Sequence, residues 1–239
     1  MDFISNHQWV IILAPFLIIA TIGVILGTKN LKREKAVRKE AQAFGYIAND
    51  KNNVKKLDDI PDFFLLAPQG KHERFLQIRN IINGYFDNIE FVMFDYMSTY
   101  SKGRTNIITA LAFPLPDDIH CDFLLTPIDR ISRIHKYAID IASNYSSLNP
   151  EYRKIDVIDN GDFSDNYLLY SNNEQTVKRL FNENTIRILS KKHSRGWHIV
   201  CKNGWMNLYH SNKTVTPGDM HDFLKKAKTI YETILAEQT

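Results

Sequence analysis

The sequence predicts an α+β protein: an N-terminal transmembrane helix, then an antiparallel β-meander and hairpin domain packed with helices, ending in a long amphipathic helix. Three observations lead to this prediction. Residues 9–26 are strongly apolar, Asn-Gly pairs divide alternating apolar runs, and an apolar stripe with helical spacing occurs near the end of the chain. The chain of 239 residues, 12% of them aromatic, is long enough for a substantial folded domain besides the N-terminal segment.

The N-terminal segment has no Asp, Glu, Lys or Arg between Asp2 and Lys29. A helix rising about 1.5 Å per residue would cross a hydrocarbon core of about 30 Å within this length. Twelve of the 18 residues 9–26 are Val, Ile, Leu or Phe, which favour insertion. We predict a transmembrane helix over residues 9–28. A cleaved signal peptide and a buried globular helix are the alternatives, and Asp2 in place of a basic leader argues against the first.

A basic segment follows at residues 29–39, with six Lys or Arg residues and one Glu. Positive charge beside a span stays preferentially on the cytoplasmic side, so we expect the N-terminus outside and the following domain in the cytoplasm, at the inner membrane of a cell. Residues 40–239 then have a net charge of −1, which argues against nucleic-acid binding. The predicted membrane-flanking residues are Lys29, Lys32, Arg33, Lys35, Arg38 and Lys39.

The chain divides into three predicted regions. Residues 1–28 contain the transmembrane helix, residues 29–60 a basic juxtamembrane helix and a polar linker, and residues 61–239 the cytoplasmic α+β domain. A sub-boundary is possible at residues 145–155. Cys121 and Cys201 form no Cys-x-x-Cys pair, so we expect both to be free, buried thiols.

Two Asn-Gly pairs occur where a type I′ hairpin turn needs positive φ at both central residues. A turn at Asn83-Gly84 would fold residues 75–92 into one hairpin. A turn at Asn203-Gly204 would pair Cys201 with Met206 and point Cys201 toward the core. A third strand pair is expected on either side of residues 101–104, which contain Gly103. The first half of the domain is therefore predicted to be an antiparallel meander.

Three helices are predicted to follow. Residues 131–141 have apolar side chains at helical spacing, and Ser171 with Glu174 offers a capping box for a second helix. The last helix has Thr216 as its N-cap and Pro217 at its first position. Its apolar stripe is Met220, Phe223, Leu224, Ala227, Ile230, Tyr231 and Ile234.

Signatures of catalysis are absent from the sequence. No Gly-x-Gly-x-x-Gly, Walker or Gly-x-Ser-x-Gly motif occurs, and the eight histidines form no His-Glu-x-x-His pair. We therefore predict no cofactor and no metal. His120 and Cys121 are adjacent, but neighbours on a strand point to opposite faces, so His120 is poorly placed to activate Cys121.

Asp95 is an unusual carboxylate within the apolar run FVMFDYMSTY. Alternation places it on the same side as Phe91 and Met93, and buried carboxylates with shifted pKa values often mark functional sites. A hydrogen-bonded structural role is the alternative. Asp95, Tyr96 and Tyr100 are the candidate binding residues, and Asp95, Cys121 and His120 are the candidate catalytic residues.

Several segments resemble bacterial single-pass membrane proteins that carry a cytoplasmic domain of unknown function. These segments are the N-terminal span, NGYF followed by FVMFDYMSTY, GDFSDNYLLYSNNEQTVKRLF and KNGWMNLY. The resemblance implies an α+β domain at the bacterial inner membrane and implies no activity.

The leading functional hypothesis is a non-enzymatic, membrane-anchored module that binds a protein partner or assembles within a complex, because tethering raises effective concentration. One alternative is a hydrolase or transferase acting near the membrane through Cys121 or Asp95, with His120, His135 or His198 brought in by the fold. Another is a lipid-sensing domain.

Overall fold

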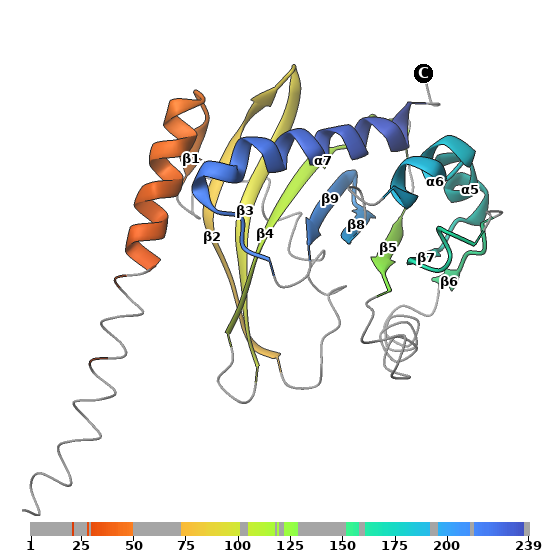
Figure 1. Ribbon diagram of the computed structural model, residues 1–239, viewed down its shortest axis with the longest axis horizontal. Helices are drawn as coiled ribbons and strands as arrows, with labels where there is room; N and C mark the ends of the chain where they lie inside the picture. The colour runs from red at the N-terminus through yellow and green to blue at the C-terminus, as the bar shows by residue number, and fades with distance from the viewer. Residues whose placement is uncertain are drawn as a thin grey trace, which may run out of the picture.

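The computed structural model describes residues 21, 28, 30–49, 73–100, 105–117, 119, 122–128, 152–157, 161–191, 196–210 and 213–236. Within them, nine strands form one antiparallel sheet (Figure 1). The strands are β1 (Ile47–Asn49), β2 (Glu73–Phe86), β3 (Ile89–Tyr100), β4 (Thr105–Pro114), β5 (Phe123–Pro127), β6 (Arg153–Lys154), β7 (Tyr167–Ser171), β8 (Trp197–Lys202) and β9 (Trp205–His210).

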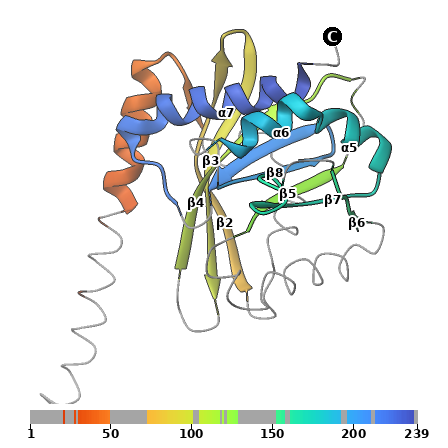
Figure 2. The same ribbon diagram turned by 45° about the vertical axis from the view of Figure 1, so that its right-hand side comes forward.

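The helices of the described residues are few. Residues 30–43 are helical, and we call this segment the N-terminal helix. The others are α5 (Glu174–Leu180), α6 (Glu183–Ser190), the short 3₁₀ helix η4 (Pro217–Asp219) and α7 (Met220–Leu235). In Figures 1 and 2, α7 crosses the sheet, with the N-terminal helix beside one of its ends and α5 and α6 near the other.

The order of the strands in the sheet is β1-β2-β3-β4-β9-β8-β5-β7-β6. The first four strands follow the order of the chain, as a meander does. The β8–β9 hairpin then joins β4 through β9, and β5 lies between β8 and β7. These last pairings join segments far apart in the chain, so local sequence patterns do not reveal them.

Both faces of the sheet are buried. On one face the N-terminal helix, α5, α6 and α7 supply apolar side chains that pack on alternate strand residues such as Phe91, Leu111 and Ile199. We call this the helix face. The opposite face carries residues such as Val92, Tyr96 and Val200, in a second apolar cluster. This alternation follows from the period of two along a strand.

The predicted fold class is wrong. The described residues form a large antiparallel β-sheet domain with few helices, in place of an α+β protein built around a transmembrane helix. The predicted meander and hairpins join edge to edge into one sheet, because each exposed strand edge offers unpaired N–H and C=O groups to the next strand. The closing helix α7 has 16 residues.

The predicted transmembrane helix is also corrected. Among the described helices, none combines the length and the apolar character that crossing a membrane requires. Residues 9–28, apart from Thr21 and Thr28, lie outside the described residues. Hydropathy measures the tendency of a segment to leave water, and it does not say which environment receives the segment.

The first predicted hairpin turn is misplaced. The Asn83-Gly84 pair lies inside β2, and the turn between β2 and β3 is formed by Asp87 and Asn88, whose φ angles are +47° and +65°. Gly84 is needed there for a different reason. A Cβ on Gly84 would lie 2.9 Å from Cδ1 of Tyr46, so the glycine allows the chain after the N-terminal helix to approach the sheet.

The second predicted hairpin is confirmed. Asn203 and Gly204 have φ angles of +52° and +75°, as a type I′ turn requires, and Cys201 pairs with Met206. Cys201 is fully buried on the helix face, as the predicted register placed it. The strand pair across residues 101–104 is confirmed as β3 and β4, with Thr99 opposite Thr105.

The helix predictions are confirmed in part. The whole predicted stripe of α7 is buried. The cap of α5 is Asn173, whose side chain accepts a hydrogen bond from the Thr176 N–H, whereas Ser171 is the last residue of β7. The helix predicted over residues 131–141, the linker at residues 50–60 and most of the possible sub-boundary lie outside the described residues.

Candidate functional site

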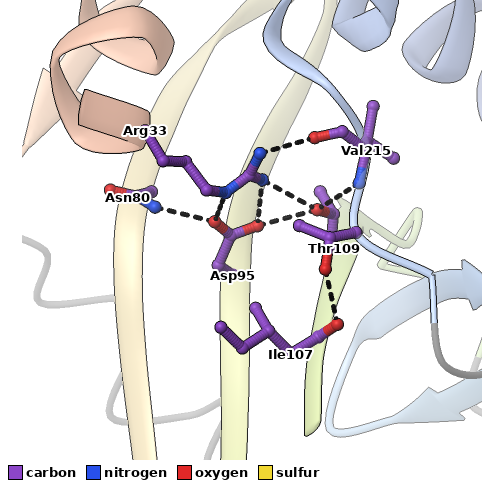
Figure 3. Close-up of polar contacts among 7 residues, drawn as sticks. Arg33, Asn80, Asp95, Ile107, Thr109 and Val215 are labelled. Atoms are coloured by element: carbon purple, nitrogen blue, oxygen red, sulfur yellow. Dashed lines mark hydrogen bonds and ion pairs between the residues drawn. The ribbon is translucent and has the colours of Figure 1, made fainter. Parts of the chain in front are cut away.

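Asp95 lies in the middle of β3, on the helix face, and is 4% exposed. The predicted alternation with Phe91 and Met93 is confirmed, because both of these belong to the apolar cluster of that face. A carboxylate in such a position is costly to bury unless it is paired and hydrogen-bonded. The structure satisfies it with three side chains from three different elements (Figure 3).

Arg33 supplies the counter-ion from the N-terminal helix. Its Nε donates to Oδ2 of Asp95 at 2.7 Å and its Nη2 donates to Oδ1 at 2.8 Å, which is the two-pronged geometry in which Arg binds carboxylates most strongly. Its Nη1 donates to the carbonyl of Val215 at 2.8 Å. One guanidinium group thus joins the N-terminal helix, β3 and the segment before α7.

Asn80 reaches Asp95 because β2 is irregular at this point. The register between β2 and β3 shifts between Arg79 and Ile82, and Asn80 has a φ of +51°, a left-handed conformation that Asn tolerates better than most residues. Its Nδ2 donates to Oδ2 of Asp95 at 2.7 Å. The bulge therefore turns an amide donor toward the carboxylate.

Thr109 completes the set of donors from β4. It is directly opposite Asp95 in the β3–β4 register, and its hydroxyl donates to Oδ1 of Asp95 at 2.7 Å. The same hydroxyl accepts a hydrogen bond from the N–H of Val215 at 3.0 Å. Each oxygen of Asp95 consequently accepts two hydrogen bonds, and an ionised carboxylate has about four acceptor positions in all.

A cavity of about 310 Å³ lies beside this network, between the N-terminal helix and strands β2, β3 and β4. Arg33, Asn80 and Asp95 belong to its wall, and Leu31 at its rim is 58% exposed. The complete lining is Asn30, Leu31, Arg33, Glu34, Arg79, Asn80, Asp95, Met97 and Ile107. It thus combines three apolar side chains with amides and both signs of charge.

The second predicted binding residue, Tyr96, is not brought to this cavity. Tyr96 follows Asp95 directly in β3, so it points to the opposite face of the sheet, where it is buried. Tyr100 is the last residue of β3 and is opposite Glu73 of β2. Of the predicted trio, Asp95 lines the cavity and Tyr96 does not, while the side chain of Tyr100 lies outside the described part of the chain.

The predicted catalytic group is only partly described. His120, Cys121 and His135 lie outside the described residues. His198 is in β8 on the face opposite Asp95, and none of the three side chains that bind Asp95 is a histidine. Among the described residues, no three His, Cys, Asp or Glu side chains are grouped so that they could hold a metal ion.

The predicted membrane-flanking residues separate into two groups. Arg33 is 21% exposed in its side chain and pairs with Asp95, and Arg38 pairs with Glu34 at 3.0 Å on the N-terminal helix. Lys32, Lys35 and Lys39 are exposed on this helix. Lys29 lies outside the described residues. One of the six basic residues, Arg33, therefore holds the N-terminal helix to the sheet, and the sequence pattern does not distinguish it from the others.

His198 is a second titratable side chain of the sheet. It is partly buried, its Nδ1 is 3.1 Å from the hydroxyl oxygen of Thr126, and its ring stacks on Tyr209 with centroids 4.8 Å apart. Desolvation, followed by the nearby charge of His210, lowers the pKa of His198 to about 3. The imidazole is therefore neutral at physiological pH and is poorly suited to bind an anion.

Sequence reasoning missed Asn80, Thr109, Val215 and the role of Arg33. Thr109 was open to prediction, because extending the β3–β4 pair from its turn places this residue opposite Asp95. Asn80 depends on a bulge and Arg33 on the docking of a helix 62 positions away in the chain. Local pattern contains neither kind of information.

Comparisons with known proteins add little to this site. No protein-family model matches the chain, and no curated protein matches it. Among solved structures, the crystal structure of the mycobacterial trehalose monomycolate transport factor A, TtfA, is similar, with a TM-score of 0.49 and 8% sequence identity. The match covers 85% of this chain and 94% of that one.

Proposed function

We propose that this protein is a non-enzymatic binding module, and that the cavity beside Asp95 receives a side chain of a protein partner. The observation that carries the proposal is the saturation of Asp95. Both of its oxygens are fully occupied by Arg33, Asn80 and Thr109, so no lone pair is left to take a proton from a substrate. The most deeply buried carboxylate of the cavity is thus structural.

The size and shape of the cavity support the proposal. A volume of about 310 Å³ is at the lower end of the range of about 300 to 1,000 Å³ for small-molecule pockets, which suits one or two side chains. The apolar members, Leu31, Met97 and Ile107, offer a surface for an apolar side chain. Exposed Leu31 at the rim would be covered by the rest of the partner segment.

The walls of the cavity are held in place before a partner arrives. Arg33 binds Asp95 and Val215 together, and Thr214 donates from its hydroxyl to the carbonyl of Ile107 at 2.7 Å. A site whose walls are fixed in advance loses less conformational entropy on binding. The polar network therefore supports recognition without taking part in chemistry.

The test uses a displayed library of random 12-residue peptides, selected on the immobilised full-length chain. Peptides that bind the wild type should bind Leu31→Ala about tenfold more weakly, since a truncated interface anchor commonly costs more than 1 kcal/mol. Ile47→Ala is the matched control, because Ile47 is 59% exposed and lies outside the cavity lining. Equal losses in the two variants, or no selected peptide at all, would contradict the proposal.

A further inference from the structure

Two ion pairs occupy most of the charged side chains around the cavity, and one arginine side chain is in neither of them. Arg33 is engaged by Asp95, and Glu34 is engaged by Arg38 on the next turn of the N-terminal helix. Arg79 also lines the cavity. Within the described residues it forms no ion pair. An arginine in this situation offers donors for a planar anion.

The fold explains why Arg79 is left over. Arg79 is directly opposite Asp95 in the β2–β3 register and is the natural cross-strand partner for its charge. Arg33 fills two acceptor positions of that carboxylate. Asn80, which the bulge after Arg79 turns toward Asp95, and Thr109 fill the other two. Figure 3 shows Arg33 and Asn80 converging on Asp95 from two different elements.

We infer that Arg79 makes the cavity a receptor for a carboxylate that adjoins an apolar side chain of the partner, with the apolar side chain against Leu31, Met97 and Ile107. This inference rests on the proposed function and names the ligand chemistry of the same site. An acidic side chain and the C-terminal carboxylate of a chain are both sources of such a group. Arg binds a carboxylate through two parallel hydrogen bonds, which fixes orientation as well as charge.

The charge balance favours a carboxylate over a phosphate. The lining contains two arginines and two carboxylates. Arg33 compensates Asp95 and Arg38, from outside the lining, compensates Glu34, so the charge that is left is that of Arg79. A phosphate group carries a charge of about −1.5 to −2, and recognition of it needs a cluster of basic residues. A monoanion needs only the single cation that is left over.

Three synthetic peptides of otherwise identical sequence test the inference by fluorescence anisotropy with the full-length chain. The first contains Leu-Glu and ends in an amide, the second contains Leu-Gln and ends in an amide, and the third ends at Leu with a free carboxylate. The protein should bind the first or the third at least about tenfold more tightly than the second, and whichever is tighter identifies the source of the carboxylate.

Two substitutions, each of which removes one positive charge, test whether Arg79 causes the preference for a carboxylate. The preference should fall to within about twofold in Arg79→Gln and persist in Arg153→Gln, since Arg153 is an exposed residue of β6 outside the cavity lining. Binding that depends on Leu31 but is equal for all three peptides overturns this inference and leaves the proposed function standing. Binding of none of them, or binding insensitive to Leu31→Ala, overturns both.

Discussion

Asp95 and His198 are titratable side chains on opposite faces of the same sheet. The charge of Asp95 is compensated by neighbouring groups, whereas His198 is kept neutral. Asp95 has an arginine and two neutral donors around it, so its charge is compensated. His198 contacts the Thr126 hydroxyl and stacks on Tyr209, and its pKa falls to about 3, so it stays neutral. The difference shows that an ion is retained at a buried position only where counter-charge and donors converge on it.

The strongest way to break this contrast is to remove the counter-ion of Asp95. Arg33→Met should lower the free energy of unfolding by about 3 kcal/mol, because it leaves a buried carboxylate without its partner. Chemical denaturation measures the change. The exposed control Arg153→Met should stay within about 0.5 kcal/mol of the wild type. Combining Arg33→Met with Asp95→Leu should recover most of the loss, and a loss under about 1 kcal/mol in the single variant would contradict the structural role.

A second experiment tests the neutral state of His198 by pH. The unfolded chain binds a proton at His198 with a pKa of about 6.5 and the folded chain with a pKa of about 3, so between these values the unfolded state holds more protons. The free energy of unfolding therefore falls as the pH decreases through this window, by about 2 kcal/mol between pH 7 and pH 5. In His198→Gln, the free energy of unfolding should lack this part of its dependence on pH. An NMR titration in which the His198 ring protonates near pH 6.5 in the folded protein would refute the expectation.

Substitution of Thr109 compares how much a neutral hydrogen-bond donor of Asp95 and its counter-ion Arg33 each contribute to the free energy of unfolding. Thr109→Val removes one hydrogen bond to Asp95 and the acceptor for the Val215 N–H at nearly constant volume, so the free energy of unfolding should fall by about 1.5 kcal/mol. This is smaller than the effect of Arg33→Met, since the ion pair remains. Thermal or chemical denaturation of both variants under one buffer condition gives the comparison. A larger loss in Thr109→Val would contradict the expectation that the ion pair with Arg33 contributes more than the hydrogen bonds of Thr109.

The smallest predicted effect concerns the backbone at Asn80. Asn80→Ala and Asn80→Gly both lose the donor to Asp95, but only glycine adopts a φ of +51° without strain. We expect Asn80→Ala to be about 1 kcal/mol less stable than Asn80→Gly. Equal stabilities, measured by chemical denaturation, would mean that the bulge relaxes when the amide is lost.

Two Asn-Gly pairs illustrate how far local sequence reaches. The pair Asn203-Gly204 forms the expected turn, and its strands pair in the expected register. The pair Asn83-Gly84 has the same turn preference but lies within β2, where Gly84 leaves room for Tyr46, and the turn is formed by Asp87 and Asn88. Turn propensity alone was sufficient in the first case and not in the second.

The candidate site was predictable to the same limited extent. Asp95 is visible as a carboxylate in an apolar strand, and alternation correctly places it on the side of Phe91 and Met93. Its partner Arg33 looked like one of several basic residues beside an apolar segment. The ion pair depends on where the N-terminal helix docks, and a helix shows its own apolar stripe but not the surface that receives it.

The sequence by itself determined the periodic features: the apolar stripe of α7, the β8–β9 turn, the burial of Cys201 and the face on which Asp95 lies. These depend on interactions within a few residues of chain, where geometry repeats with a known period. Only the tertiary structure decided the single nine-stranded sheet, the saturation of Asp95 and the cation left over at Arg79. Those features depend on which distant segments meet, and that is settled by the packing of the whole chain.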